Sequence, residues 1–156
     1  MKKLIVLVAS LAVSGVFAAT TGELILSGLV NTVFSITVTA DPAASSLDIE
    51  GGENATKVAT VAEQSNNPGG YKIRVSSDNG GKLINNTNAN SFLSYQISYG
   101  GGSNLQPSVS ATTVKTVASL ASPANANSDV TISFTGKSDA LGGTYSDRLV
   151  FEISAP

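Results

Sequence analysis

The chain has 156 residues, a formal net charge of −2 and neither cysteine nor histidine. That length suits one ordinary domain with a real hydrophobic core. The absence of a basic stripe argues against nucleic acid or anionic lipid as a partner. Without histidine and cysteine, the chain lacks the usual nucleophile–base pairs, the general base that titrates near neutral pH and the two best ligands of zinc.

Residues 1–18 have the three-part pattern of a secretory signal peptide. Two lysines precede the mostly apolar run Leu4–Ala18, which is shorter than the roughly 20 residues that span a bilayer. Val16 and Ala18 suit the two small-residue positions before a cleavage site. We therefore expect export and a mature chain, Ala19–Pro156, whose seven basic and eleven acidic residues give a net charge of −4 and which does not insert into a membrane. An uncleaved membrane anchor is the alternative.

The segment Glu23–Val30 follows the expected cleavage site and is apolar on both faces. One face carries Leu24, Leu26, Gly28 and Val30, and the other carries Ile25 and Leu29. A strand apolar on both faces is usually buried on both, and a terminal segment frays unless something holds it. The segment is either the first strand of its own sandwich, which the residues alone favour, or a donor strand that completes the sheet of a neighbouring subunit. Head-to-tail donation does not close on itself and builds a fibre.

Strict alternation of apolar and polar residues, in segments rich in β-branched and aromatic side chains, predicts half-buried strands. These strands are residues 33–40, 71–77, 93–99, 129–135 and 145–153. Glycine pairs and triplets between them suit tight turns. Short strands at this spacing predict an all-β sandwich or barrel in a single domain, residues 19–156.

Other segments have weaker patterns. Residues 47–50, 57–63 and 109–117 are plausible strands. Apolar residues at helical spacing over 114–121 allow a short helix instead, which Pro123 would stop. Small polar residues over 119–128 predict a loop.

Tyr145 follows the Gly142-Gly143 turn and begins the last predicted strand. In β-sandwiches, a tyrosine at this place can donate a hydrogen bond from its hydroxyl back across the corner to the backbone. We therefore assign Tyr145 an architectural role as a structural corner and no role in binding.

Two motifs resemble known surface proteins. The sequence Gly143-Thr144-Tyr145-Ser146-Asp147, followed by alternating apolar residues, resembles the final strand of bacterial fimbrial (pilin) subunits and spore-coat-protein-U-like secreted proteins. The run Ser65–Ser77, read SNNPGGYKIRVSS, resembles a central segment of such proteins. The resemblance implies an immunoglobulin-like antiparallel β-sandwich, passage through the periplasm, and assembly into surface fibres by a periplasmic chaperone and an outer-membrane usher. It also implies that residues 23–30 are the donor segment.

Catalytic and metal sites have little support in the sequence. A pair of carboxylates can hydrolyse glycosides, but no acidic pair stands in a recognisable setting. Calcium is the remaining metal hypothesis, with hard oxygen ligands from acidic turn residues. The candidates are Asp48, Glu50, Glu53, Asp78 and Asp139. Because aspartate and asparagine in turns commonly bond their own backbone, we favour no metal, no cofactor and no catalytic residue.

Three functions remain open at this point. The first is a non-catalytic structural subunit of a bacterial surface fibre or coat, joined by β-strand donation to other copies of itself or to related subunits. The second is a monomeric secreted adhesion module that binds a glycan or a protein. The third is an unrecognised hydrolase. The first is favoured, because residues 23–30 and the resemblance point to strand donation, while the missing general base argues against the hydrolase.

Overall fold

The computed structural model describes residues 20–156, so the predicted signal peptide, residues 1–18, lies outside the described residues. Residues 20–33 carry no secondary structure, and Asn31–Pro156 form the folded unit. Its elements in chain order are β1 (Phe34–Ala40), the 3-10 helix η1 (Pro42–Ser45), β2 (Gly52–Ser65), β3 (Tyr71–Ser77), β4 (Lys82–Asn85), β5 (Phe92–Ser94), β6 (Gln96–Tyr99), β7 (Thr112–Val117), β8 (Ala124–Thr135), β9 (Tyr145–Ser146) and β10 (Leu149–Ser154).

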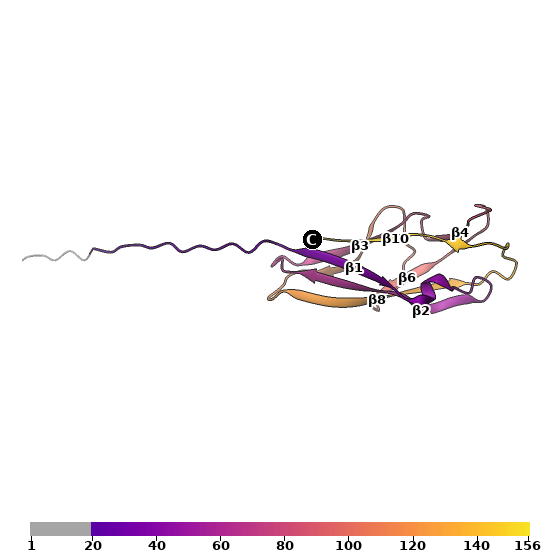
Figure 1. Ribbon diagram of the computed structural model, residues 1–156, viewed down its shortest axis with the longest axis horizontal. Helices are drawn as coiled ribbons and strands as arrows, with labels where there is room; N and C mark the ends of the chain where they lie inside the picture. The colour runs from indigo at the N-terminus through magenta and orange to yellow at the C-terminus, as the bar shows by residue number, and fades with distance from the viewer. Residues whose placement is uncertain (1–19) are drawn as a thin grey trace, which may run out of the picture. The chain divides into compact units, whose positions relative to one another are not determined.

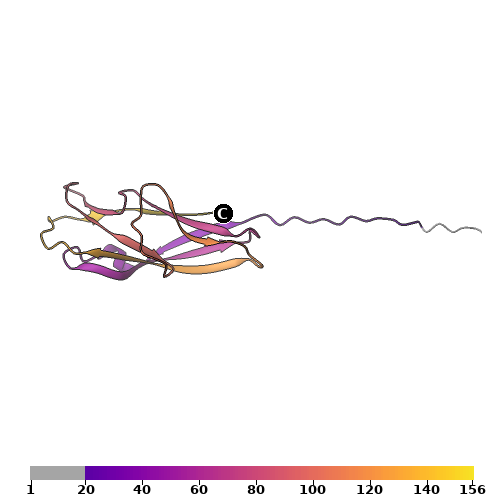
Figure 2. The same ribbon diagram turned by 180° about the vertical axis from the view of Figure 1, so that it is seen from behind.

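The strands form three antiparallel sheets. The first sheet has the order β1-β2-β8-β6, and the second has the order β10-β3-β7. A small third sheet has the order β5-β4-β9. The two larger sheets lie as facing layers (Figure 1 and Figure 2). The predicted all-β fold, an antiparallel sandwich, is therefore confirmed.

The strand order is of the immunoglobulin-like type. In such a sandwich one sheet has the order A-B-E-D and the other contains C, F and G. Strands β1, β2, β8 and β6 take the places of A, B, E and D, and β3 and β10 take those of C and F. Within Asn31–Pro156, no strand pairs with the second edge of β10, where strand G would lie. The immunoglobulin-like sandwich is thus present with its last strand position empty.

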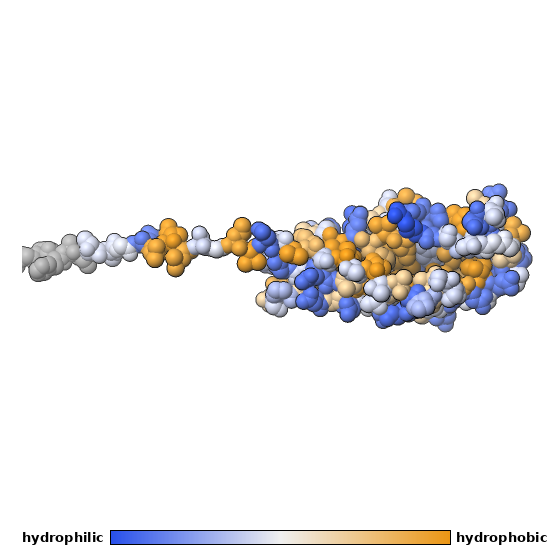
Figure 3. Space-filling view, viewed as in Figure 1, coloured by the Kyte–Doolittle hydropathy of each residue, from blue (hydrophilic) through white to orange (hydrophobic). Residues whose placement is uncertain are grey.

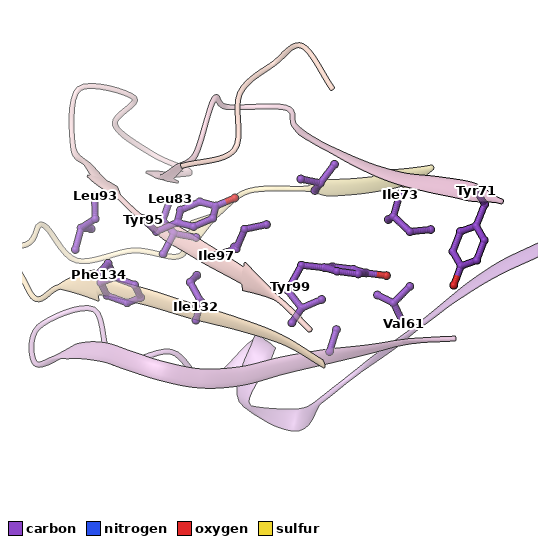
Figure 4. Close-up of a cluster of buried hydrophobic side chains, with 13 residues drawn as sticks. Val61, Tyr71, Ile73, Leu83, Leu93, Tyr95, Ile97, Tyr99, Ile132 and Phe134 are labelled. Atoms are coloured by element: carbon purple, nitrogen blue, oxygen red, sulfur yellow. The ribbon is translucent and has the colours of Figure 1, made fainter. Parts of the chain in front are cut away.

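The core lies between the two larger sheets (Figure 4). Strand β3 shows why the sequence folds this way, because its odd-numbered residues Tyr71, Ile73 and Val75 are all buried as the alternation predicts. The opposing sheet contributes Val61 and Val130. Full burial of one such aliphatic side chain stabilises the fold by about 1.5 to 3 kcal/mol. The strands are therefore held by the faces that the sequence pattern marks as apolar.

Two sequence-based predictions are wrong and one open alternative is decided. Residues 47–50 form no strand but a turn, in which the N–H of Gly52 donates to the carbonyl of Asp48 at 2.8 Å. The predicted strand over 109–117 is present as β7, so the alternative of a short helix over 114–121 is not formed. The predicted loop 119–128 ends early, because β8 already begins at Ala124, which pairs with Ser65 of β2. Pairing with a neighbouring strand overrides the weak strand propensity of these small polar residues.

Two predicted strands are each divided. Residues 93–99 form β5 in the third sheet and β6 in the first, with the buried Tyr95 between them. Residues 145–153 form β9 and β10, which are separated by Asp147 and Arg148. The chain changes sheets at both places. The alternation continues unbroken through Tyr95, whereas Asp147 puts a carboxylate on the otherwise apolar inward face. Strand β4 was not predicted.

Candidate functional site

The candidate site lies where the edge strands of the two larger sheets, β1 and β10, run side by side. Strand β10 pairs with β3 through its one edge and turns Leu149, Phe151 and Ile153 inward, where they are only half-buried. Strand β1 pairs with β2 alone. Within Asn31–Pro156, the facing edges of β1 and β10 belong to no ladder. Unpaired edges of this kind are templates for the addition of another strand.

An apolar groove of about 320 Å³ lies between these two edges. Val38 of β1 and Phe151 of β10 stand on its walls, and core residues such as Ile97, Val130 and Ile132 form its floor. Apolar surface is visible along the middle of this face, between polar rims (Figure 3). Val38 remains 48% exposed although it points toward the interior. The groove therefore opens the core of the sandwich to solvent.

Asp147, just before β10, lines one end of the groove and holds that end in place through hydrogen bonds. Its carboxylate accepts hydrogen bonds from the hydroxyl of Tyr95 at 2.6 Å, the Oγ of Ser77 at 2.5 Å and the backbone N–H of Asn79 at 3.0 Å. Burial and the hydrogen bond to Asp147 both raise the pKa of the Tyr95 hydroxyl, so it remains a donor. These bonds set the place at which β10 begins.

Tyr145 lies beside this end of the groove, at the start of β9. Its hydroxyl donates to the carbonyl of Leu141 at 3.0 Å and is 2.7 Å from the Oγ of Ser91. A hydrogen bond from the hydroxyl to a backbone carbonyl four residues upstream is the geometry expected of a tyrosine corner. The architectural role of Tyr145 remains a prediction.

Asn85, which sequence reasoning missed, organises the same corner. It is 2% exposed, and its Nδ2 donates to the carbonyls of Leu141 at 3.2 Å and Gly142 at 3.3 Å. Its Oδ1 accepts from the N–H of Thr87 at 2.9 Å and of Asn88 at 3.1 Å. The strand alternation of β4 places Asn85 inward, but its partners come from loops that no periodicity connects.

We expect Asn85→Ala to lower the free energy of unfolding by about 2 to 3 kcal/mol, because it removes a buried amide and its hydrogen bonds to four backbone groups. Urea denaturation followed by circular dichroism measures the change. Asn90→Ala is the matched control, since Asn90 is exposed in the same loop and should change the midpoint little. Equal midpoints for the two variants would contradict the central place of Asn85.

A second buried polar cluster surrounds Glu63 of β2, which is 2% exposed. Its carboxylate accepts from the hydroxyls of Tyr99 at 2.6 Å and Tyr71 at 2.8 Å, the Oγ of Ser128 at 2.7 Å and the Nζ of Lys115 at 2.8 Å. Figure 4 shows the two tyrosines, one from each of the facing sheets. We call these five residues the Glu63 cluster. Because its donors come from β3, β6, β7 and β8, it ties the two sheets together.

The electrostatics of the Glu63 cluster fit a structural role. Burial by itself raises the pKa of Glu63, but the hydrogen bonds from Lys115, Tyr99, Ser128 and Tyr71 together hold this pKa below its ordinary value of 4.5. Burial and the bond to Glu63 raise the pKa of Tyr71 to about 12. A carboxylate that accepts from four donors has little capacity left for a substrate proton or a metal ion. A sequence signal was present, since Glu63 interrupts the apolar inward face of its strand.

The acidic residues considered for calcium mostly bind the protein itself. Asp48 Oδ1 accepts from the N–H of Gly51 at 2.8 Å, and Glu53 accepts from the N–H of Asp48 at 2.9 Å and from the hydroxyl of Thr56. Asp78 pairs with Arg148 at 2.9 Å. Among residues 20–156, no group of three or more acidic side chains is placed to hold a metal ion. No helix in this part of the chain has the length and hydropathy needed to cross a membrane.

The predicted donor segment precedes the folded unit Asn31–Pro156. Residues 23–30 are not part of a strand, and their apolar side chains are solvent-exposed. The exposed fractions are 80% for Leu24, 84% for Leu26 and 84% for Val30 on the one face, and 80% for Ile25 and 88% for Leu29 on the other. Exposed large apolar side chains that gather on one short segment commonly mark an interaction site.

Comparison with known proteins assigns no family. No family model matches the chain, and no curated protein sequence matches it. Among solved structures, the chain is similar to the CooA pilin subunit from enterotoxigenic Escherichia coli, with 15% sequence identity and a TM-score of 0.38 over 73% of this chain and 76% of that chain. Similarity at this level is too low to assign the chain to a family.

Proposed function

We propose that the protein is a non-catalytic structural subunit of a bacterial surface fibre or coat, assembled by β-strand donation. The observation that supports this most is the empty strand position beside β10, where an apolar groove opens the core between two unpaired strand edges. An added strand would bond the free edge of β10 through its backbone and fill the groove with alternate side chains. Such an addition would cover the exposed edge of β10.

The proposed occupant is residues 23–30 of another copy of the chain or of a related subunit. Eight residues of extended strand span about 26 Å, which is ample for the six residues of β10. The face with Leu24, Leu26, Gly28 and Val30 would point into the groove. The exposure of these side chains supports the proposal, because an apolar terminal segment needs a partner to leave water.

The ends of the strands indicate how copies would be joined. Phe34 at the start of β1 pairs with Ser65, and Ser154 at the end of β10 pairs with Lys72, so both ends lie near the β2–β3 turn. The start of β1, to which residues 23–30 connect, therefore lies at the end of the domain where β10 stops. A donor that runs antiparallel to β10 places successive domains head to tail and leaves the series open. A donor that runs parallel to β10 would bring the same end of two domains together, and mutual donation would then close a dimer. We therefore propose the antiparallel arrangement.

The same proposal covers location and partners. Export by the predicted signal peptide, residues 1–18, would carry the subunit to the periplasm and then to the cell surface. An open apolar groove is an aggregation hazard in transit. We therefore include a periplasmic chaperone that covers the groove and an outer-membrane usher that exchanges it for the donor strand.

Deletion of residues 19–30 tests strand donation. We expect the intact mature chain to form a ladder of multimers in size-exclusion chromatography and on unheated denaturing gels, and the truncated chain to form none. The truncated chain should also unfold at lower urea concentration than the multimers. An intact chain that runs as one monomer, with unchanged stability after the deletion, would contradict the proposal and favour a monomeric adhesion module. A single dimer would contradict the open series.

A further inference from the structure

Asn66, at the end of β2, binds the backbone that leads into β1. Its side-chain Oδ1 accepts from the N–H of Val33 at 2.6 Å, and its Nδ2 donates to the carbonyl of Asn31 at 2.9 Å. The backbone N–H of Asn66 donates to the carbonyl of Val33 at 3.4 Å. These partners fix the orientation of the amide, because an N–H only donates and a carbonyl only accepts. The Asn66 side chain thus stands in for a strand neighbour of residues 31–33, just before β1 begins at Phe34.

The turn that follows Asn66, residues 67–70, is held by its own hydrogen bonds and by close packing. In this turn, Asn67 Nδ2 donates to the carbonyl of Gly70 at 2.8 Å, and the N–H of Gly70 donates to the carbonyl of Asn67 at 2.9 Å. Gly70 has a φ of +81°, and a Cβ there would lie 1.8 Å from the carbonyl oxygen of Val117. The turn therefore has little freedom to carry Asn66 away from residues 31–33.

The three residues held in this way are the residues that would have to turn if residues 23–30, the N-terminal arm, filled the groove of their own domain. Residues 23–30 and β1 are separated by Asn31, Thr32 and Val33 alone. Three residues are a common length for a β-hairpin loop. A hairpin would lay the arm antiparallel to β1 and close the groove within one copy. Extended backbone at residues 31–33 is incompatible with that loop.

We infer that Asn66 is a positioning residue for strand donation: it holds residues 31–33 extended, so that the arm is offered to a second copy instead of turning back into its own groove. The inference rests on the proposed function and goes beyond it, because it names the residue that selects between assembly and self-closure. While Asn66 holds residues 31–33, the arm could enter the groove of its own domain only if the chain turned back before residue 31. That turn would use residues of the donor segment, which could then no longer fill the groove.

The test compares Asn66→Ala with the unchanged mature chain, residues 19–156. We expect the ratio of monomer to multimer to rise about tenfold, in line with the loss of two modest hydrogen bonds. Hydrogen exchange should show that the Val33 amide loses its protection. Asn66→Asp, which keeps the acceptor for Val33 but cannot donate to Asn31, should give an intermediate ratio. Gln64→Ala is the matched control, because Gln64 is an exposed amide on the same strand and should leave the ratio unchanged.

A second measurement separates donating from accepting. In the full chain with Leu24→Asp and Leu26→Asp, the donor segment should no longer bind a groove. Binding of a synthetic peptide of residues 20–31 then measures whether the groove of this chain can still accept a strand. Adding Asn66→Ala to this chain should leave peptide capture unchanged, because Asn66 does not line the groove. Loss of capture would show a general defect and overturn the positioning role. If Asn66→Ala forms multimers to the same extent as the unchanged chain, the positioning role of Asn66 is wrong, but strand donation itself is not contradicted. A wild-type monomer whose groove captures no peptide would instead overturn strand donation itself.

Discussion

Glu63→Ala is expected to lower the free energy of unfolding by about 3 to 5 kcal/mol. The substitution removes the acceptor of four donors and leaves the ammonium of Lys115 beside a cavity without its counter-charge. Only Glu63 is fully buried in this charge pair, so the main cost is the loss of the common acceptor of four donors. Urea denaturation of the mature chain measures the loss. Glu152→Ala is the matched control, because Glu152 is an exposed glutamate on β10 and should change the stability little.

The pH dependence of stability distinguishes the charge of Glu63 from its packing. The folded-state pKa of Glu63 lies below its ordinary value of 4.5, so the unfolded state binds the proton more readily. The contribution of the ionised carboxylate is therefore complete above pH 4.5 and is lost as the pH falls through the folded pKa. Wild-type stability should decline below about pH 4.5 more steeply than that of Glu63→Gln, which has no charge to lose. Parallel curves for the two proteins would show that the charge of Glu63 contributes nothing.

Val38→Asp is expected to weaken assembly at least about 100-fold while the domain stays folded. Val38 points into the groove, yet it is 48% exposed, so an aspartate there remains hydrated in the free subunit. A donor strand in the groove would strip water from the carboxylate without supplying a partner, at a cost of several kcal/mol. Sizing of the mature chain measures the loss of multimers, and circular dichroism checks the fold.

Thr37→Asp provides the control for this variant. Thr37 is the preceding residue of β1 and points to the opposite face of the sheet, away from the groove. An equal charge at that position should leave assembly nearly unchanged. If both variants assemble like the wild type, the groove between β1 and β10 is not the acceptor. If both fail equally, the outer face of the first sheet takes part in assembly.

The alternation of residues determined which segments are strands and which side chains face the core. It predicted β3 at its observed bounds and gave the inward face of β1 and β10 correctly, because burial of every second residue is a local property of an extended chain. It does not mark the change of sheet at Tyr95, where the pattern is unbroken. At Asp147 a carboxylate interrupts the apolar inward face, and this interruption coincides with the second change of sheet. The turn at residues 47–50 was mistaken for a strand because its apolar residues alternate, while the hydrogen bonds between Asp48, Gly51 and Glu53 decide its shape.

The composition and the apolar face of residues 23–30 were readable from the amino acids alone, and so was the absence of the side chains on which most hydrolases depend. The tertiary structure decided where a strand is missing. Whether β10 is an edge strand depends on the order in which distant segments pair, and no local period contains that order. The same holds for the Glu63 cluster and for the hold of Asn66 on residues 31–33, because their partners are brought together only when the two sheets close.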